Sequence, residues 1–321
     1  MAREVTSPKP VVSLADIQAA RERIDAYIVR TPLHRLPGGP LLKLESLQVT
    51  GAFKARGAFN HVLALREECR GGIVTASSGN HGKAVAYVAK TMALHAVVVV
   101  PDDVVAAKAE AITAFGAELI RFGHYSEEQV AHAQQLAARR GLHYVPPYDD
   151  ALVIAGQGTA GLEIVEQHPE VTVVFVPVSG GGLISGVATA VKTVRPAARI
   201  VGVEPAGAPR FARSRTAGKP IALERAETIA DGLRVLTPGR LTWEIVNRYV
   251  DEFTAVSDDA TLAAVRQLLV EGNVVVEPSG AVAVAAALGA PRPGGHAVAV
   301  VSGGNADPQL ISQLLGSKSL A

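Results

Sequence analysis

Apolar residues in this chain fall into short runs rich in valine and isoleucine, separated by longer alanine-rich segments. The first block begins at residue 72 and contains the runs "GIVTAS", "HAVVVVP" and "ELIRFG". The second block contains "VTVVFVPV", "ARIVGVEP" and, near the end, "AVAVVSGGN". Short β-branched runs that alternate with segments of helical length are typical of βαβ units around a parallel sheet. We therefore predict an α/β protein with two doubly wound domains, each built on an open, mostly parallel, twisted sheet.

An amphipathic helix is expected before the first block, in "SLADIQAARERIDAYI". Ser13 suits the N-cap position, with Asp16 three residues later. Four apolar residues fall near one face of this helix: Leu14, Ile17, Ile24 and Ile28. Between the two blocks, "YVPPYDDALVIAGQGT" contains two prolines and an acidic pair, which indicates a crossover between the domains.

Composition narrows the possible functions. The 321 residues are 48% hydrophobic and 19% charged, enough to bury the cores of two domains. The 31 basic and 30 acidic residues nearly cancel, so no field would concentrate nucleic acid or bind an anionic membrane. The start "MAREVTSPKPVVSLADIQ" does not resemble a signal peptide, and the longest apolar stretch is too short to span a bilayer. We expect a cytoplasmic protein that acts on small molecules. Cys69 is the only cysteine, which excludes an internal disulfide and a thiolate metal site.

A glycine-rich loop follows the run "VTVVFVPV". Gly180 and Gly182, with Ser185 in the third small position and Glu204 about twenty positions later, fit the dinucleotide fingerprint. The three consecutive glycines, which include Gly181, equally suit backbone N–H groups that wrap one terminal phosphate at a helix N-terminus. The loop alone leaves a dinucleotide, a phosphate monoester and a purely structural turn open.

Two further loops follow predicted strands. "TASSGNHGKA" offers Ser77, Ser78 and Asn80 beside the free N–H groups of a helix, which is a carboxylate-binding surface. A simple helix cap would need only one of these side chains. "VSGGNAD" places further glycines, Ser302 and an asparagine after the last strand. Because open α/β sheets bind ligands at the carboxyl ends of their strands, we expect the three loops to line one cleft.

Lys54 follows the turn "GAF" and begins a predicted helix, with Phe53 beside it. An ammonium group near the positive end of a helix has a lowered pKa, which suits a lysine that acts as nucleophile and base. The spacing alone favours the simpler alternative of a surface lysine beside Arg56.

Seven motifs resemble one family in their order along the chain. They are "KLESLQVTGAFKARGA", "SSGNHG", "IAGQGT", "PVSGGGLISG", "TIADGL", "EPSGAVAVAA" and "VSGGN". Together they resemble the pyridoxal phosphate-dependent threonine and serine dehydratases, which include serine racemases and have the fold called type II. The resemblance runs from about residue 13 to the end. It implies pyridoxal 5'-phosphate as cofactor, which carries one phosphate monoester and needs one lysine.

The resemblance also implies a domain division. We expect a large, discontinuous cofactor-binding domain of residues 1–71 and 150–321, and a small substrate-closing domain of residues 72–149. The cofactor would lie in the cleft between them. The chain stops shortly after "VSGGN", so we expect no C-terminal regulatory domain. A homodimer is what the family implies.

Position by position, the resemblance makes Lys54 the Schiff-base lysine and places Phe53 against the cofactor. Asn80 would hydrogen-bond the 3'-oxygen of the cofactor, and Ser302 would meet its pyridine nitrogen. The phosphate would be held by four backbone N–H groups: Gly180, Gly181, Gly182 and Leu183.

The substrate would be faced by three side chains of the second loop: Ser77, Ser78 and His81. The two serines would bind its carboxylate. Ser78 also resembles the residue that racemases use as acid or base on the face opposite Lys54. Lys54 and Ser78 are therefore the predicted catalytic residues.

The sequence departs from the family at three places. Ala52 stands where the commonest form has serine, and "TPLHRLPGGPLLKLE" is several residues shorter than usual. Members activated by a divalent cation resemble this chain at Glu204 and use a carbonyl at the position of Ala208, but they have an acidic side chain in place of Arg210. A guanidinium there would repel a cation, so we predict no divalent metal and expect Arg210 to pair with Glu204.

The resemblance implies a carbon–oxygen lyase that eliminates water from threonine, serine or a related β-hydroxy amino acid, giving a 2-oxo acid and ammonia. Alternatives within the family are racemisation through Ser78, or elimination from hydroxyaspartate, phenylserine or a substrate derived from hydroxyectoine. From another class, an NAD-dependent oxidoreductase would use Gly180, Gly182 and Glu204, but it leaves Lys54 unexplained. A non-catalytic pyridoxal phosphate carrier is the remaining alternative.

Overall fold

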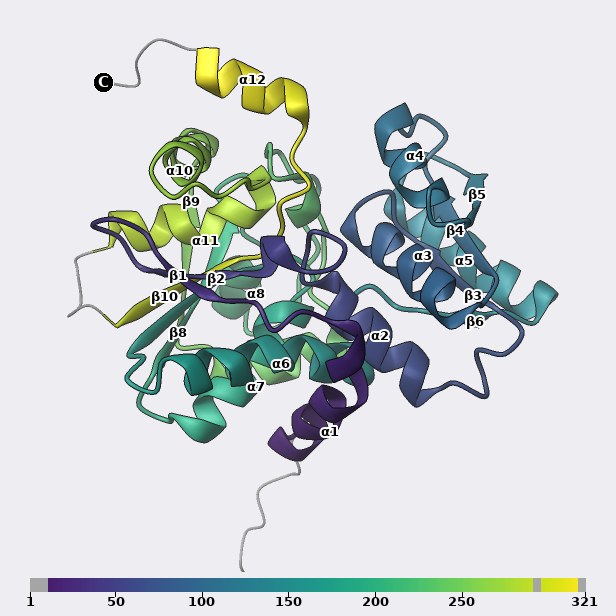
Figure 1. Ribbon diagram of the computed structural model, residues 1–321, viewed down its shortest axis with the longest axis horizontal. Coiled ribbons are helices and arrows are strands. Elements are labelled where there is room, and N and C mark those ends of the chain that lie inside the picture. The colour runs from purple at the N-terminus through teal and green to yellow at the C-terminus, as the bar shows by residue number, and fades with distance from the viewer. Residues whose placement is uncertain (1–10, 291–295, 317–321) are drawn as a thin grey trace, which may run out of the picture.

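The computed structural model describes residues 11–290 and 296–316, and its chain forms two sheets (Figure 1). Six strands form the larger sheet in the spatial order β1 (Leu33–Arg35), β2 (Leu41–Leu44), β10 (Ala297–Val301), β7 (Val173–Pro177), β8 (Arg199–Pro205) and β9 (Glu252–Val256). All neighbours pair parallel except β1 with β2. The smaller sheet is entirely parallel, in the order β5 (Glu118–Arg121), β4 (Ala96–Val100), β3 (Ile73–Ala76) and β6 (His143–Tyr144).

The helices of the described chain connect these strands. They are α1 (Leu14–Ile24), α2 (Lys54–Ala64), α3 (Asn80–Met92), α4 (Ala106–Thr113), α5 (Ser126–Arg140), α6 (Ala151–Gln167), α7 (Gly182–Val194), α8 (Arg210–Ala217), α9 (Arg240–Tyr249), α10 (Asp258–Val270), α11 (Pro278–Gly289) and α12 (Pro308–Gly316). Single 3₁₀ turns occur at η1 (Asp25–Tyr27), η2 (Glu45–Leu47) and η3 (Asp231–Leu233). The predicted cap of α1 is confirmed, because Ser13 Oγ accepts from Asp16 N and the Asp16 carboxylate accepts from Ser13 N. Ile28 lies beyond the end of this helix.

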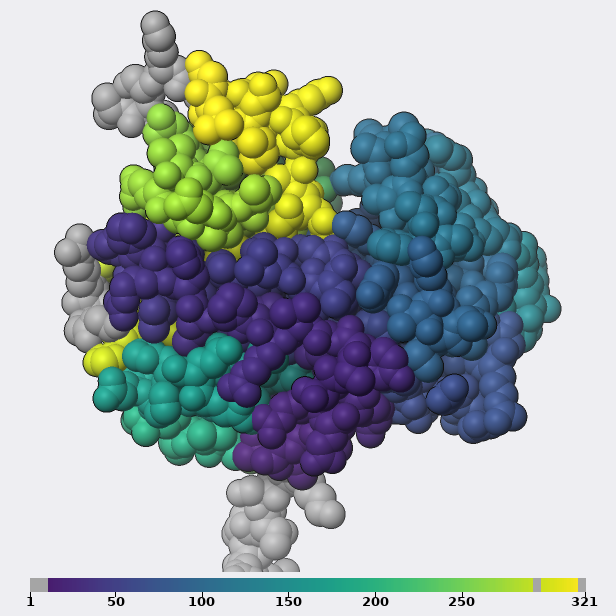
Figure 2. Space-filling view, in the orientation of Figure 1, coloured from purple at the N-terminus to yellow at the C-terminus, as the bar shows by residue number. Residues whose placement is uncertain are grey.

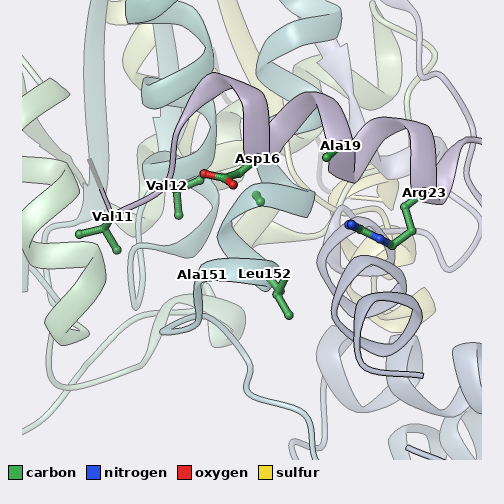
Figure 3. A pocket seen from close by; sticks show the side chains of 8 residues that line it. Val11, Val12, Asp16, Ala19, Arg23, Ala151 and Leu152 are labelled. Carbon is green, nitrogen blue, oxygen red and sulfur yellow. The ribbon is translucent and has the colours of Figure 1, made fainter. Parts of the chain in front are cut away.

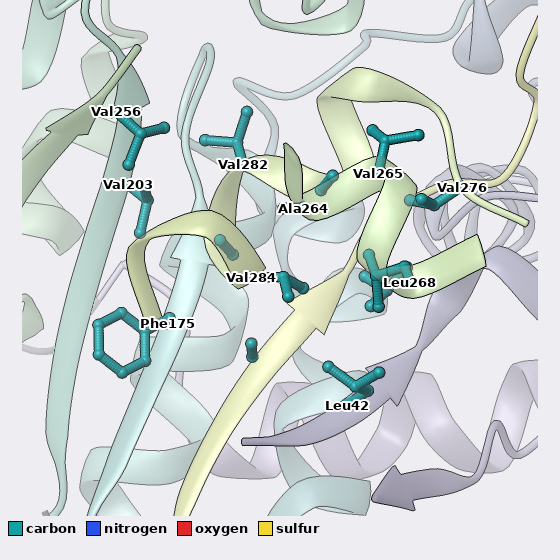
Figure 4. Close-up of a cluster of buried hydrophobic side chains, with 14 of the residues drawn as sticks. Leu42, Phe175, Val203, Val256, Ala264, Val265, Leu268, Val276, Val282 and Val284 are labelled. Carbon is teal, nitrogen blue, oxygen red and sulfur yellow. The ribbon is translucent and has the colours of Figure 1, made fainter. Parts of the chain in front are cut away.

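Helices cover both faces of the larger sheet. Successive residues of β7 point to opposite faces: Phe175 packs with α10 and α11, whereas Val174 and Val176 pack with α6 and α7. Figure 4 shows the first of these clusters, in which Val265 and Leu268 of α10 lie close to the strands. Burial on both faces explains why the strands read as continuous apolar runs in the sequence.

The smaller sheet is covered in the same way. Val98 packs against α2, α3 and α4 on one face, and Val97 and Val99 pack against α5 on the other. Two sheets with helices on both faces confirm the predicted fold class. Figure 2 shows a notch in the surface between the unit coloured blue and the C-terminal helix coloured yellow.

Helix α2 lies between the two sheets, and its contact with α6 is unusually close. A Cβ atom at Gly57 would lie 2.4 Å from the Gln157 side chain, and one at Gly156 would lie 2.6 Å from the carbonyl oxygen of Arg56. Glycine at both positions lets the two helix backbones approach. The first residue of α2, Lys54, is thereby fixed between the sheets.

Four buried charged side chains lie at this helix contact. Arg56 donates to Glu45 at 2.7 Å and to Glu163 at 2.6 Å, and Lys43 donates to Glu163 at 2.5 Å. Their side chains are at most 4% exposed. The two cations and two anions balance, which is how charges are tolerated away from water.

A small cavity of about 150 Å³ lies between α1 and the start of α6 (Figure 3). Val12, Asp16 and Leu152 are among its lining residues, and none of the predicted site residues lines it. Among the described residues, no helix is long and apolar enough to cross a membrane. The expectation that the N-terminal segment is not a signal peptide concerns a stretch whose first ten residues lie outside the described ranges.

Candidate active site

Lys54 is the first residue of α2, and its side chain is half-buried. Its Nζ donates to the carbonyl oxygen of Pro147 at 2.7 Å and lies 5.2 Å from the ring centroid of Phe53. Burial lowers the pKa of Lys54 to about 8. At pH 7 roughly a tenth of the amine is then neutral, against well under a thousandth for an ordinary lysine. Lys54 is therefore not the fully exposed lysine of the simpler alternative, and its role as Schiff-base lysine stays a prediction.

The glycine loop leads from β7 into α7. Gly181 has a φ of +99°, and a Cβ atom there would lie 2.7 Å from Phe211 Cζ. A Cβ atom at Gly180 would lie 2.5 Å from the ring of Tyr148. Because α7 begins at Gly182, the first N–H groups of that helix have no partner within it and can bind an anion. The buried Ser179 Oγ, which has no hydrogen-bond partner, lies in the same turn.

A short segment joins Lys54 to the glycine loop. Pro147 accepts the hydrogen bond of Lys54, and the next residue, Tyr148, packs on Gly180 and Gly182. The following residue, Asp149, caps α9 by accepting from the N–H groups of Arg240 and Leu241 at 2.9 and 2.8 Å. The amine and the anion-binding loop therefore lie on either side of residues 147 and 148.

Asn80, the first residue of α3, makes two side-chain hydrogen bonds. Its Nδ2 donates to Glu277 Oε1 at 2.6 Å, and its Oδ1 accepts from Asn305 Nδ2 at 2.7 Å. A Cβ atom at Gly303 would lie 2.1 Å from Glu277 Oε1 and 3.2 Å from Asn80 Nδ2. The "SSGNHG" loop and the "VSGGN" loop are thereby in contact. Burial raises the pKa of Glu277 to about 7.

Ser302 lies at the end of β10 and connects with the start of α2. Its carbonyl oxygen accepts from Phe53 N at 3.1 Å, and Ala52 bridges Gly303. The Ser302 hydroxyl is buried and donates to the carbonyl oxygen of Ser279 at 3.3 Å. The loops that contain Lys54, Asn80 and Ser302 thus form one continuous set of contacts.

The three predicted substrate residues of the "SSGNHG" loop have different surroundings from one another. Ser77 Oγ accepts from Gly79 N at 3.2 Å, and Ser78 is half-buried. His81 is buried, and its Nε2 donates to the carbonyl oxygen of Val145 at 3.1 Å. Burial, followed by the charge of Lys54, lowers the pKa of His81 to about 3, so this ring is neutral. The roles of Ser77, Ser78 and His81 toward a substrate stay predictions.

The expected pairing of Glu204 with Arg210 is wrong. The two Glu204 oxygens accept from Phe211 N and Ala212 N at 2.9 Å each, in the first turn of α8. Arg210 instead donates to the carbonyl oxygens of Val178 and Leu233 at 3.1 and 2.6 Å. The reason is that free N–H groups at a helix N-terminus satisfy a buried carboxylate better than one side chain of that same turn. Among the described residues, no group of three or more candidate ligands could hold a metal ion.

Sequence reasoning missed several residues of this region: Pro147, Tyr148, Glu277, Asn305 and Lys83. Glu277 and Asn305 lie within motifs that were recognised, "EPSG" and "VSGGN", but nothing in their spacing says which partner they meet. A glutamate directly before a proline at a helix start, followed by a buried alanine-rich helix, is a usable signal for a buried carboxylate. Pro147 acts through its backbone carbonyl, which no side-chain pattern reports.

Comparison with known proteins covers nearly the whole chain. The sequence profile of the family described as "Pyridoxal-phosphate dependent enzyme" matches residues 24–303. The L-threonine ammonia-lyase of Thermotoga maritima is 40% identical over 314 residues, covering 95% of this chain and 78% of the relative.

Solved structures are similar over the same extent. Maize serine racemase has a TM-score of 0.90 at 38% identity, covering 95% of this chain and 97% of its own. Serine racemase from Dictyostelium discoideum has a TM-score of 0.86 at 36% identity, covering 92% of this chain and 99% of its own. A threonine deaminase from Solanum lycopersicum has a TM-score of 0.89 at 34% identity, covering 98% of this chain and 92% of its own. The "SSGNHG" loop and the glycine loop lie inside the matched family region, whereas the "VSGGN" loop extends two residues beyond its end.

Proposed function

Because the chain belongs to the family of pyridoxal-phosphate dependent enzymes, we propose that it eliminates water from threonine, serine or a related β-hydroxy amino acid. The products are a 2-oxo acid and ammonia, and the enzyme is a carbon–oxygen lyase whose cofactor is pyridoxal 5'-phosphate. One observation carries the proposal: the half-buried Lys54 amine, whose pKa is lowered, lies one short segment away from a glycine loop that opens onto the free N–H groups of α7.

The residues present fit this cofactor. The turn at Gly180, Gly181 and Gly182 has no room for a Cβ atom at its first two positions, and it leads into the free N–H groups of α7. Leu183 is the next residue of that helix. The buried, unpartnered Ser179 hydroxyl is a further donor for a phosphate. Lys54 supplies the amine that bonds to an aldehyde, Phe53 lies beside it, and no group beyond one phosphate and one aldehyde is needed.

Lys54 is the proposed base. Pyridoxal phosphate held between Lys54 and the glycine loop would supply an electron sink that acidifies the α-proton of the substrate amino acid. The Lys54 amine removes that proton, and its lowered pKa keeps a usable fraction neutral at physiological pH. Pro147 O accepts from the protonated form and orients it. The electron pair of the broken C–H bond forms the Cα–Cβ double bond while the Cβ–O bond breaks, and the hydroxyl leaves with a proton as water. The resulting enamine is released, and a water molecule hydrolyses it to the 2-oxo acid and ammonia.

The remaining side chains bind and orient. Asn80 donates to the 3'-oxygen of the cofactor, and Ser302 meets its pyridine nitrogen. A hydroxyl at Ser302 cannot hold that nitrogen protonated as a carboxylate would, which favours loss of a β-leaving group over a long-lived carbanion. Ser77 and Ser78 bind the substrate carboxylate at the N-terminus of α3, and neutral His81 completes that surface.

Racemisation is the second candidate activity, supported by the similarity to maize serine racemase. Ser78 would return a proton to the face opposite Lys54. Chiral analysis of the remaining substrate decides between the two: racemisation predicts accumulation of the other enantiomer, lost in Ser78→Ala while cofactor binding persists.

We also propose the domain division at residues 72–149, action in the cytoplasm on a small amino acid, and a homodimer. All four strands of the smaller sheet fall between residues 73 and 144, which supports the division. Light scattering after size-exclusion chromatography tests the dimer.

The central experiment measures ammonia and 2-oxo acid release from a panel of β-hydroxy amino acids, on protein shown to be yellow and bleached by borohydride. Release from threonine or serine supports the lyase. A colourless protein that binds NAD would overturn the proposal, and a yellow protein that neither releases ammonia from nor racemises any member of the panel would support a carrier.

A further inference from the structure

Four side chains near the predicted cofactor site form one chain of hydrogen bonds. Lys83 Nζ donates to Asn305 Oδ1 at 2.7 Å, and Asn305 Nδ2 donates to Asn80 Oδ1 at 2.7 Å. Asn80 Nδ2 then donates to Glu277 Oε1 at 2.6 Å. We call this set of four residues the amide relay. It runs from the exposed Asn305 to the buried Glu277.

The two ends of the amide relay determine the direction of every bond in it. An ammonium group only donates, so Lys83 must face the oxygen of the Asn305 amide. The carbonyl oxygen of Thr50 only accepts, and it lies 3.0 Å from Asn305 Nδ2, which fixes the same orientation independently. At the other end, Asn80 faces Asn305 Nδ2 with its Oδ1, so the Asn80 Nδ2 must face Glu277 Oε1, which accepts whether or not the carboxyl carries a proton. Each asparagine therefore has one orientation that satisfies all its neighbours.

This orientation decides what Asn80 offers to a ligand. Its Oδ1 is used by Asn305, and one Nδ2 hydrogen is used by Glu277. The second Nδ2 hydrogen is left to donate to a ligand oxygen. With the amide reversed, the same position would present a carbonyl oxygen, which repels an acceptor.

We propose that Asn305 and Glu277 are positioning residues that fix the polarity of the Asn80 amide, so that Asn80 presents an N–H group to an acceptor oxygen of the bound cofactor. The inference rests on the proposed function, because it assumes that Asn80 contacts the cofactor. Lys83 and the carbonyl of Thr50 act one step further away, by orienting Asn305.

The amide relay also connects the two sheets. Asn80 and Lys83 belong to α3, which covers the smaller sheet. Glu277 precedes α11, and Asn305 follows β10 of the larger sheet. The Asn80 amide is therefore held in its donating orientation only while the two units are in contact.

The test reverses the polarity of the bond between residues 305 and 80, and it also removes the bond from Asn305 Nδ2 to the Thr50 carbonyl. Asn305→Asp replaces a donor with an acceptor, so that acceptors face Asn80 from both sides. In the double variant Asn305→Asp with Glu277→Gln, the Asn80 amide can rotate by half a turn. Its nitrogen then donates to the carboxylate introduced at position 305, and its oxygen accepts from the amide introduced at position 277. Lys90→Met, an exposed change on the same helix, is the matched control.

Three readouts are measured on the holoenzyme: the melting temperature, the dissociation constant of pyridoxal phosphate, and the position and pH midpoint of its visible band. We expect Asn305→Asp to lower the melting temperature and to weaken cofactor binding roughly tenfold. The double variant should regain the part of the melting temperature that was lost at Asn80, though not the part lost at the Thr50 carbonyl, while cofactor binding stays about tenfold weaker and the band stays shifted. Glu277→Gln alone keeps an acceptor and should remain within about threefold of the wild type.

The outcomes separate the possible failures. Recovery of both cofactor binding and the visible band in the double variant would show that the amide relay is only structural, and would overturn the inference. An equal loss in Glu277→Gln alone would assign the effect to the charge of Glu277, which also overturns it. A wild-type protein without any visible band would instead refute the proposed function.

Discussion

The Lys54 amine and the Pro147 carbonyl meet at 2.7 Å although they are 93 residues apart in the chain. The contact joins the start of α2 to the segment that precedes α6. The carbonyl holds the amine in place without pairing it to a carboxylate, so burial can lower the pKa.

The reactivity of Lys54 should therefore follow a pKa of about 8. We expect the rate at which cofactor-free protein combines with pyridoxal phosphate to rise with pH through about 8, because only the neutral amine attacks an aldehyde. Stopped-flow absorbance between about pH 6 and pH 10 checks this. Lys54→Ala should give no visible band, whereas Lys90→Ala should keep it. A midpoint at the ordinary lysine value, or retained turnover in Lys54→Ala, would contradict the assignment.

Gly181 should tolerate no side chain. In Gly181→Ala the new Cβ would meet Phe211 and Thr242 in addition to the strain of a positive φ. We expect a loss of about 2–4 kcal/mol in the free energy of unfolding and at least roughly tenfold weaker cofactor binding.

The matched control is Gly218→Ala, which has a φ of +68° but no atom within 4 Å of its Cβ position. It should cost only about 1 kcal/mol of stability and leave cofactor binding unchanged. Equal effects of the two substitutions on cofactor affinity would argue against an anion site at Gly181.

The fold was predictable because its signals are local. Runs such as "AVVVV" and the Ser13 cap depend on neighbours within a few residues, and both are confirmed. The pairing of Arg210 was not predictable, because it depends on where α8 begins. The same holds for Glu277 and Pro147, whose partners Asn80 and Lys54 are brought close only by the complete fold.

The buried charges at the contact of α2 and α6 should be strongly coupled. Glu163→Gln leaves Arg56 and Lys43 with one carboxylate between them, and we expect a loss of about 3–5 kcal/mol. Adding Lys43→Met to that variant restores the balance of charge, so it should recover part of the loss. Urea unfolding of the wild type, both single variants and the double variant measures this coupling. Strictly additive effects would show that the four charges act independently.

Glu277 should make stability fall as pH rises. Its folded pKa of about 7 is above that of an exposed glutamate, because of burial, so the folded state binds more protons between about pH 4.5 and 7. We expect this group to remove roughly 2–3 kcal/mol of stability between about pH 5 and pH 8. Glu277→Gln cannot titrate, so its stability should change less over this range. Parallel pH dependences of the two proteins in chemical denaturation would refute the shift.

The close approach of α2 and α6 through Gly57 and Gly156 means that the chain leaves the larger sheet and returns to it at almost the same place. The smaller α/β unit is in this sense an insertion with neighbouring ends. An insertion of this kind can change separately from the part that holds Lys54 and the glycine loop, except where the two parts touch. Those contacts are Asn80 and Lys83 with Glu277 and Asn305, and Pro147 with Lys54, so a change of substrate made through the smaller unit has to leave them intact.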